Sequence, residues 1–135
     1  MASVFARAPT VPAGRAFTCT ATRVWDGDGP IWCAEGERLR LHDVAARELD
    51  GSCRPGQPCP RASGVEARDR LVALLGGTRG STEDGHVIVS GPAMPCRSFG
   101  PDRYGRTVAA CTLAGRDLGE QLIAAGVALI WHYRD

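Results

Sequence analysis

Carboxylates and arginines gather in three short stretches of this sequence. DGDG covers residues 26–29, RLRLHDVAARE covers 38–48, and DRYGR covers 102–106. Carboxylate oxygens are the ligands that hard cations such as Ca²⁺ take in proteins. Arginine is a permanently charged, fork-shaped donor that suits phosphate, and all sixteen basic residues of the chain are arginines. These three stretches are therefore the candidates for a site that performs chemistry.

Each stretch also has an ordinary structural interpretation. Asp-Gly pairs favour tight hairpin turns, and Gly105 can take a positive φ in a second turn. Arg40 can be a surface strand residue in an exposed salt bridge, and Glu48 can be solvated. The spacing of the histidines does not match a metal site, so the sequence predicts structural or solvated roles for His42, His86 and His132.

The elements that must position these stretches are mostly strands. Residues 16–23, 31–34 and 37–44 predict strands, with a hairpin turn at DGDG. Ser63 and Glu66 fit the S-x-x-E capping box that begins a helix, with Val65, Leu71, Val72 and Leu75 on one face, and Gly76 and Gly77 end it. Residues 86–90 and 106–114 predict further strands. Asp117 can cap a last helix.

This order predicts an α+β, mainly β, fold: a five-stranded OB-fold barrel with two or three attached helices. Residues 1–15 are expected to form a flexible N-terminal extension and residues 16–135 a single domain, since the length suits one core. The formal net charge of +1 provides no global attraction to nucleic acid or acidic membranes. No apolar stretch is long enough to span a membrane, and we expect a monomer.

Six cysteines in so short a chain predict three disulfides and an oxidising compartment. Two alternatives stay open, namely six reduced buried thiols, or a zinc site built from Cys53, Cys59 and a histidine. The N-terminus does not have the apolar core of a signal peptide. Either the chain is not exported, or it is secreted or periplasmic after removal of a leader, and the cysteines favour the second interpretation.

The pairing of the cysteines follows in part from register. Cys96 and Cys111 are equidistant from a hairpin centred between residues 103 and 104, so their Cβ atoms should lie within disulfide reach. Cys53 and Cys59 flank the short loop RPGQP. Elimination leaves Cys19 with Cys33, although the register of the first hairpin does not place these two residues opposite each other.

In this order and spacing, the three stretches resemble the staphylococcal nuclease (thermonuclease) family. The family pattern runs DGDT, then R-L-x-G-I-D-A-P-E, then D-[RK]-Y-G-R, then a helix before G-L-A, to which GEQLIAAGVALIW is similar. The resemblance covers about residues 16–131. It implies an OB-fold phosphodiesterase that uses calcium to cut DNA and RNA, here with single-stranded or flexible nucleic acid as the expected substrate.

The resemblance implies a role for four residues of this chain, and Tyr104 is a separate candidate for contact with a base. Asp28 matches the second aspartate of DGDT, which is a metal ligand. Arg40 and Arg106 match the two arginines that bind the phosphate and act in catalysis. Glu48 matches the terminal glutamate of D-A-P-E, the proposed base. Tyr104 could lie beside a bound base. We expect Arg40 and Arg106 to converge on one anion near Asp28 and Glu48.

The chain departs from the family pattern at the metal ligands. Ala45 replaces the aspartate of D-A-P-E, which is the second carboxylate ligand, and Gly29 replaces the threonine of DGDT. Arg47 replaces the proline and brings a positive charge that could bind phosphate or repel the metal. Ala46 still matches the residue that offers its backbone carbonyl. Calcium affinity depends on ligand charge, so the loss at Ala45 should weaken binding.

These departures leave more than one functional hypothesis. The first is a metal-dependent phosphodiester hydrolase, a nuclease weakened by the loss of one carboxylate. The alternative is a catalytically degenerate OB-fold module that binds nucleic acid or another partner. A third is hydrolysis with a divalent metal other than calcium at a rearranged site.

Overall fold

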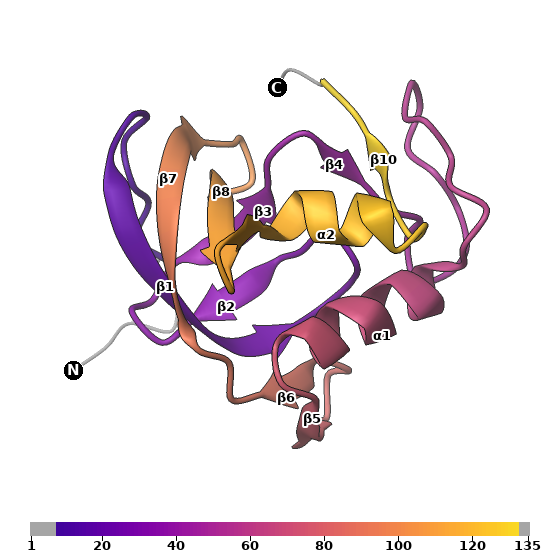
Figure 1. Ribbon diagram of the computed structural model, residues 1–135, viewed down its shortest axis with the longest axis horizontal. Coiled ribbons are helices and arrows are strands. Elements are labelled where there is room, and N and C mark those ends of the chain that lie inside the picture. Colours follow the sequence, from indigo (N-terminus) through magenta and orange to yellow (C-terminus); the bar gives the residue numbers. More distant parts are fainter. Residues whose placement is uncertain (1–7, 133–135) are drawn as a thin grey trace.

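The computed structural model describes residues 8–132, in which strands close into a barrel with helices packed beside it (Figure 1). The expected fold class, an OB-fold-like barrel of five strands, is confirmed. Strand β3 pairs in parallel with β8, and the sequence β1–β2–β3–β8–β7 returns to β1 through antiparallel pairs. The five strands are β1 (Ala16–Val24), β2 (Ile31–Cys33), β3 (Arg38–Leu41), β7 (Ala93–Pro101) and β8 (Thr107–Leu113).

Five further strands lie outside the closed barrel. Strand β6 pairs with the end of β1 and with β5, β9 pairs with β8, and β10 pairs with β4. The last pair matters for function because it ties the C-terminal part of the chain to the segment that follows β3. The bounds are β4 (Val44–Ala45), β5 (Thr78–Ser81), β6 (Val87–Val89), β9 (Arg116–Asp117) and β10 (Leu129–Ile130).

Two helices, α1 (Gly64–Leu74) and α2 (Leu118–Ala124), lie against the barrel and contact each other (Figure 1). The predicted capping box of α1 is confirmed: the Ser63 hydroxyl accepts from the Glu66 backbone N–H at 3.0 Å, and the Glu66 carboxylate accepts from the Ser63 N–H at 3.3 Å. Asp117 caps α2 by accepting from the Glu120 N–H at 2.8 Å. Both caps satisfy backbone donors that a helix start leaves unpaired.

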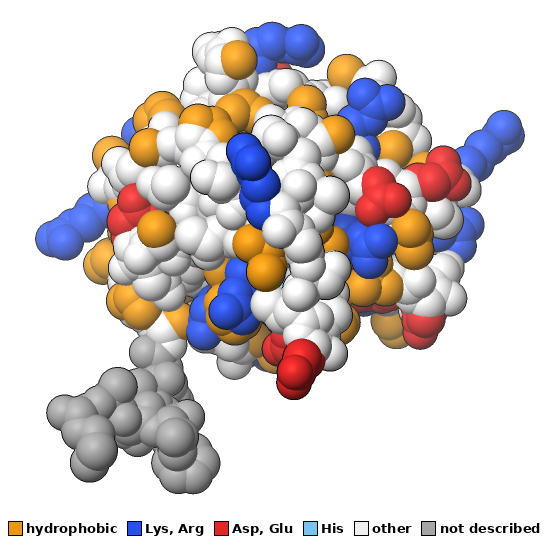
Figure 2. Space-filling view, turned by 90° about the horizontal axis from the view of Figure 1, so that it is seen from below, with side chains coloured by type: hydrophobic (Ala, Val, Ile, Leu, Met, Phe, Trp, Pro, Cys, Tyr) orange, Lys and Arg blue, Asp and Glu red, His pale blue; other side chains and the backbone are white. Residues whose placement is uncertain are grey.

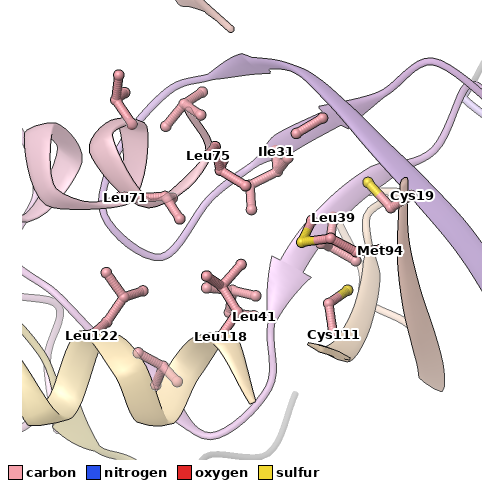
Figure 3. Packing of buried hydrophobic residues seen from close by; sticks show 14 of the residues in the cluster. Cys19, Ile31, Leu39, Leu41, Leu71, Leu75, Met94, Cys111, Leu118 and Leu122 are labelled. Atoms are coloured by element: carbon pink, nitrogen blue, oxygen red, sulfur yellow. The ribbon is translucent and has the colours of Figure 1, made fainter. Parts of the chain in front are cut away.

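Leucines from both helices fill the space between helices and barrel (Figure 3). The buried stripe of α1 runs through Ala67, Leu71 and Leu75 at the i, i+4 spacing of one helix face. Val65 was predicted on that face, but its side chain is 42% exposed. It lies two positions before Ala67, which turns it away from the buried stripe. The other labelled core residues come from β1, β2, β3, β7, β8 and α2: Cys19, Ile31, Leu39, Met94, Cys111, Leu41, Leu118 and Leu122.

All three predicted disulfides are present, and no cysteine of the chain is free. Cys96 lies opposite Cys111 as predicted, although the turn is centred on Tyr104, because a shift in register between Ser98 and Gly100 compensates. The pair Cys19–Cys33 joins β1 and β2 diagonally, with Cα atoms 4.9 Å apart, and the third disulfide is Cys53–Cys59. Three disulfides indicate an oxidising compartment.

Part of the predicted N-terminal extension is attached to the barrel. The backbone N–H of Val11 donates to the Thr107 hydroxyl at 3.2 Å, and the Ser98 hydroxyl donates to the Val11 carbonyl at 2.7 Å. Gly14 donates to the Ser98 carbonyl at 2.8 Å. Residues 11–14 therefore follow β7 and β8, whereas residues 1–7 lie outside the described range. Neither helix of residues 8–132 is long and apolar enough to cross a membrane.

Candidate functional site

Four of the charged residues singled out in the sequence lie in one corner of the barrel, which we call the acidic corner: Asp26, Asp28, Arg40 and Glu48. The two aspartates belong to the loop between β1 and β2, Arg40 to β3, and Glu48 to the segment after β4. Both aspartates are almost completely buried, at 4% and 5% exposure. The structure thus brings Asp28, Arg40 and Glu48 to one region of the fold, as expected.

The Asp26 carboxyl holds its proton much more strongly than an ordinary aspartate. Its pKa is raised to about 9, first by burial and then by the charge of Asp28, a side-chain hydrogen bond with Asp28 and the charge of Glu48. Two carboxylates held together out of water share a proton more readily than both ionise. The corner therefore carries one less negative charge than its residue types imply.

The Arg40 guanidinium is fully buried and is engaged by the protein itself. Nη1 donates to the Leu41 carbonyl at 2.6 Å and Nη2 to the Val44 carbonyl at 2.9 Å. Nη2 also lies 3.6 Å from Asp28 Oδ2. These contacts use the fork that the resemblance assigns to phosphate, so Arg40 fixes the turn between β3 and β4 in this conformation.

The remaining oxygens expected to bind calcium are also occupied by protein donors. Asp28 Oδ2 accepts from the Ala46 backbone N–H at 3.1 Å, and the Ala46 carbonyl accepts from the Gln57 side chain at 2.8 Å. Arg47 donates to the carbonyls of Pro60 and Gly51 at 2.6 and 2.7 Å, so its charge anchors the loop that contains the Cys53–Cys59 disulfide. This loop covers the corner, and the donor set does not fit a hard cation, which needs six to eight accessible oxygens.

Packing explains the two alanines. Ala45 is fully buried and pairs with Leu129 of β10, so a carboxylate there would leave water. A Cβ at Gly27 would lie 3.0 Å from the Ala46 Cβ and would collide with the Cβ of Ala67 on α1. The helix therefore presses directly on the acidic corner, where only small side chains fit.

Another group of possible metal ligands lies at Cys33, Glu35 and Glu37. Cys33 is bonded to Cys19, so it has no thiolate to offer. Both oxygens of the Glu35 carboxylate accept hydrogen bonds from Thr20, at 2.8 Å each. Cys33 and Glu35 are therefore occupied by other partners, whereas Glu37 Oε1 is buried without a hydrogen-bond partner among the described residues.

A second charged region crosses the outer surface of the barrel. Register places Arg23 of β1 opposite Trp32 of β2, and Trp32 opposite Arg38 of β3. Strands β3 and β8 are parallel, and Leu39 pairs with Thr107. The residues that precede these two, Arg38 and Arg106, are therefore also neighbours, and Arg106 continues the row. We call this row, together with Tyr104, the arginine–aromatic face.

The centre of the face is a tryptophan between two guanidinium groups. Arg38 lies 3.4 Å and Arg23 4.6 Å from the centroid of the Trp32 ring. Desolvation lowers the pKa of Arg38, and the charge of Arg23 lowers it further. Within residues 8–132 neither Arg23 nor Arg38 has a carboxylate at ion-pair distance. Two neighbouring cations that repel each other favour an anion beside them. One carboxylate is near: Asp84 lines the adjoining hollow, and its pKa is lowered chiefly by a hydrogen bond from Thr82 and in smaller part by the charges of His86 and Arg23.

A hollow of about 560 Å³ opens beside this row. Trp32, Arg38, Tyr104 and Arg106 line it, together with Trp25, Pro30, Asp84 and His86. A second hollow of about 350 Å³ shares Arg38 and Tyr104 with the first. Tyr104 is 63% exposed, so its ring is available to a ligand.

Asp102 shapes this end of the face. Its Oδ1 accepts from the backbone N–H groups of Tyr104 and Arg106 at 2.9 and 3.0 Å, and its Oδ2 accepts from Arg106 Nε at 2.7 Å. One buried carboxylate thus holds the DRYGR turn and orients Arg106. The Arg106 guanidinium lies 5.2 Å from the Tyr104 ring, as a cation–π pair.

The predicted site therefore divides in two. Asp28, Arg40 and Glu48 form the acidic corner, while Tyr104 and Arg106 belong to the arginine–aromatic face. Arg106 shares a hollow with Arg38, while Arg40 pairs with Val108, two positions after Arg106 on β8. No described contact joins the Arg40 and Arg106 guanidinium groups, so their convergence on one anion stays a prediction.

Sequence reasoning did not identify Arg23, Trp32 and Arg38 as candidate site residues. In the sequence these residues belong to three separate strands, where they appear only as part of the alternation of side chains. They become neighbours in one site only when the registers of the strands are known. No protein-family model and no curated protein matches this chain. Its resemblance to the staphylococcal nuclease family therefore rests on the three motifs alone.

Proposed function

We propose that this chain is an OB-fold module that binds single-stranded or flexible nucleic acid on the arginine–aromatic face. The observation that carries the proposal is the row across β1, β2 and β3, in which Arg23 and Arg38 flank Trp32 and neither has a described carboxylate at ion-pair distance. OB-folds bind oligonucleotides on the face that includes strands 2 and 3. Unpaired guanidinium groups bind phosphates, and aromatic rings stack on bases.

Binding by this face is local and depends on salt. The net charge is only +1, and Figure 2 shows a surface on which arginine side chains stand apart among hydrophobic and uncoloured atoms. The affinity then comes from a few phosphate contacts with Arg23, Arg38 and Arg106 and from stacking on Tyr104, whose ring is 63% exposed. Trp32 supports the two guanidinium groups that contact its ring. A strand whose bases are unpaired can use both kinds of contact, whereas a duplex offers only its phosphates.

The test is fluorescence anisotropy with labelled single-stranded DNA and RNA and with a duplex of equal length, in the presence of a chelator. We expect single strands to bind more tightly than duplex. Replacing Tyr104 by leucine should weaken binding about 5- to 150-fold, since stacking is worth about 1–3 kcal/mol per base. Arg38→Gln should reduce the slope of log affinity against log salt by about one.

Arg97 offers the matched control. It is exposed on β7, opposite Ala16 and Ala110 and outside the row. Arg97→Gln removes the same charge as Arg38→Gln and should leave both the affinity and the salt slope nearly unchanged. Equal losses in the two variants, or equal affinity for duplex and single strands, would contradict the proposed face.

A second candidate function is metal-dependent phosphodiester hydrolysis at the acidic corner. It is supported by the contact between Asp28 and Arg40 and by the nearby Glu48. The test is cleavage of denatured DNA with calcium, manganese or chelator, by the natural protein and by Ala45→Asp. Without metal, Ala45→Asp should destabilise the fold by about 3 kcal/mol or more, because it buries a charge.

The two outcomes of the Ala45→Asp experiment are distinct. If the corner retains a dormant metal site, calcium should restore the melting temperature of Ala45→Asp and raise its cleavage rate, and Arg106→Ala in that background should remove the gain. If neither protein cleaves under any condition and calcium does not restore stability, the hydrolase candidate is excluded. The binding proposal is unaffected by either result.

A further inference from the structure

A cluster of two histidines and one aspartate lies at the turn between β3 and β4 and at the end of β10. The Asp43 carboxylate atom Oδ2 is 2.8 Å from His132 Nδ1 and 3.2 Å from His42 Nε2. His132 is 89 residues from Asp43 in the sequence. The fold thus brings together three residues whose spacing in the sequence did not indicate a common site.

The backbone around the cluster is well fixed. Trp131 donates its N–H to the Asp43 carbonyl at 3.0 Å, and β10 pairs with β4 directly beside it. His42 donates its backbone N–H to Ala109 at 2.9 Å, and its ring stacks on Phe99 with the centroids 3.6 Å apart. Only the His132 side chain, 76% exposed, has freedom to move. Two of the three groups are therefore held before any ligand arrives.

The cluster opens into a hollow of about 240 Å³ that holds further carboxylates. Asp117 and Glu120 line the same hollow as His42, Asp43 and His132. The Asp117 carboxylate caps α2, whereas Glu120 is exposed and its carboxylate makes no ion pair among the described residues. Glu120 is thus the candidate for an additional oxygen ligand.

We propose that His42, Asp43 and His132 bind a divalent transition-metal ion of the zinc type, with Glu120 or water completing the shell. Imidazole nitrogens and carboxylate oxygens bind Zn²⁺ at about 2.0–2.2 Å, in tetrahedral geometry. Ligand atoms at such distances are about 3.3 Å from each other, and the two nitrogen–oxygen separations of 2.8 and 3.2 Å are close to that value. The two histidine nitrogens lie more than 4.8 Å from each other in this conformation. Binding therefore requires the exposed His132 ring to turn toward His42 and to give up its hydrogen bond to Asp43.

This site differs in chemistry and place from the acidic corner. The corner offers oxygens to a hard cation, whereas the cluster offers two nitrogens, which select zinc, copper or nickel over calcium. Because His132 follows β10, a bound ion would join the C-terminal segment to the β3–β4 turn. Metal binding should therefore stabilise the folded state as well as load the site.

The experiment uses the full chain without an affinity tag, freed of metal by a chelator. Titration with Co²⁺ near neutral pH should produce the visible absorption of a tetrahedral complex at one equivalent, and Zn²⁺ should displace it. Calorimetry should give a micromolar or tighter dissociation constant for Zn²⁺, and Zn²⁺ should raise the melting temperature. Calcium should neither bind at this site nor raise the melting temperature.

Variants locate the site. His132→Ala should keep the fold, because the side chain is exposed, and should weaken Zn²⁺ binding by at least about 100-fold. Asp43→Asn should weaken it as well, and asparagine tolerates the positive φ of +57° at this position. The control Glu37→Gln alters the other acidic cluster and should bind Zn²⁺ like the natural protein. Absence of saturable binding up to millimolar Zn²⁺, or equal binding by His132→Ala, overturns the proposal.

Discussion

Replacing Asp26 by asparagine should stabilise the protein at neutral pH and remove most of the fall in its stability toward alkaline pH. The carboxyl has a pKa of about 9 in the folded state, mainly because it is buried, against an ordinary value of 3.8. Between these two values the folded state binds one proton more than the unfolded state. The free energy of unfolding therefore declines as pH rises through this window, by up to about 1.4 kcal/mol per unit.

The size of the effect follows from the same two values. A pH of about 7 lies about three units above the pKa of this carboxyl in the unfolded state. Keeping the carboxyl protonated in the folded state therefore lowers the free energy of unfolding by about 4 kcal/mol. Asparagine has the same shape, carries no charge, and can donate to Asp28 through its amide as the protonated carboxyl does. We expect Asp26→Asn to be more stable than the natural protein at about pH 7 by up to that amount, and equal to it near pH 4.

Urea unfolding at a series of pH values, with chelator present and disulfides intact, measures the difference. Asp69→Asn is the control, since Asp69 is exposed on α1 and its one ion-pair partner within residues 8–132 is Arg68. A difference between Asp26→Asn and the natural protein that does not change between about pH 5 and pH 8 would show that Asp26 is ionised in the folded state. The acidic corner would then carry both charges, and the argument against a hard cation there would lose its main electrostatic support.

Three further changes test the packing around the acidic corner. Gly27→Ala should cost about 1–3 kcal/mol, because the new Cβ collides with Ala67, and urea unfolding measures it. The double change Cys53→Ser and Cys59→Ser should cost about 2 kcal/mol, the closure entropy of so short a loop, with a lower melting temperature in calorimetry. Ser63→Ala should lower stability by about 1 kcal/mol through loss of the capping box, and thermal unfolding followed by circular dichroism would show it; no change in any of the three would contradict the packing described.

Local chemistry was predictable wherever a few neighbouring residues decide the outcome. The capping box at Ser63 and Glu66 and the cap at Asp117 depend on contacts three residues apart, and both are present. The disulfide between Cys96 and Cys111 depends on hairpin symmetry, and the pair forms even though a register shift moves the turn by half a residue. The order of strands and helices was sufficient for the barrel because connections between such elements are short.

The sequence by itself determined the types of groups present, the local caps and turns, and the small residues at positions 45 and 46. Only the tertiary structure decided what each charged group does, because burial and strand register join residues far apart in the chain. Arg40 looked like a phosphate ligand but is buried among backbone carbonyls, while Arg38, two positions earlier, lies on the outer face beside Trp32. Asp43 and His132, separated by most of the domain, meet because β10 pairs with β4. The amino-acid sequence defines which side chains can carry a charge, whereas the tertiary structure determines how each of them is solvated and which groups it contacts.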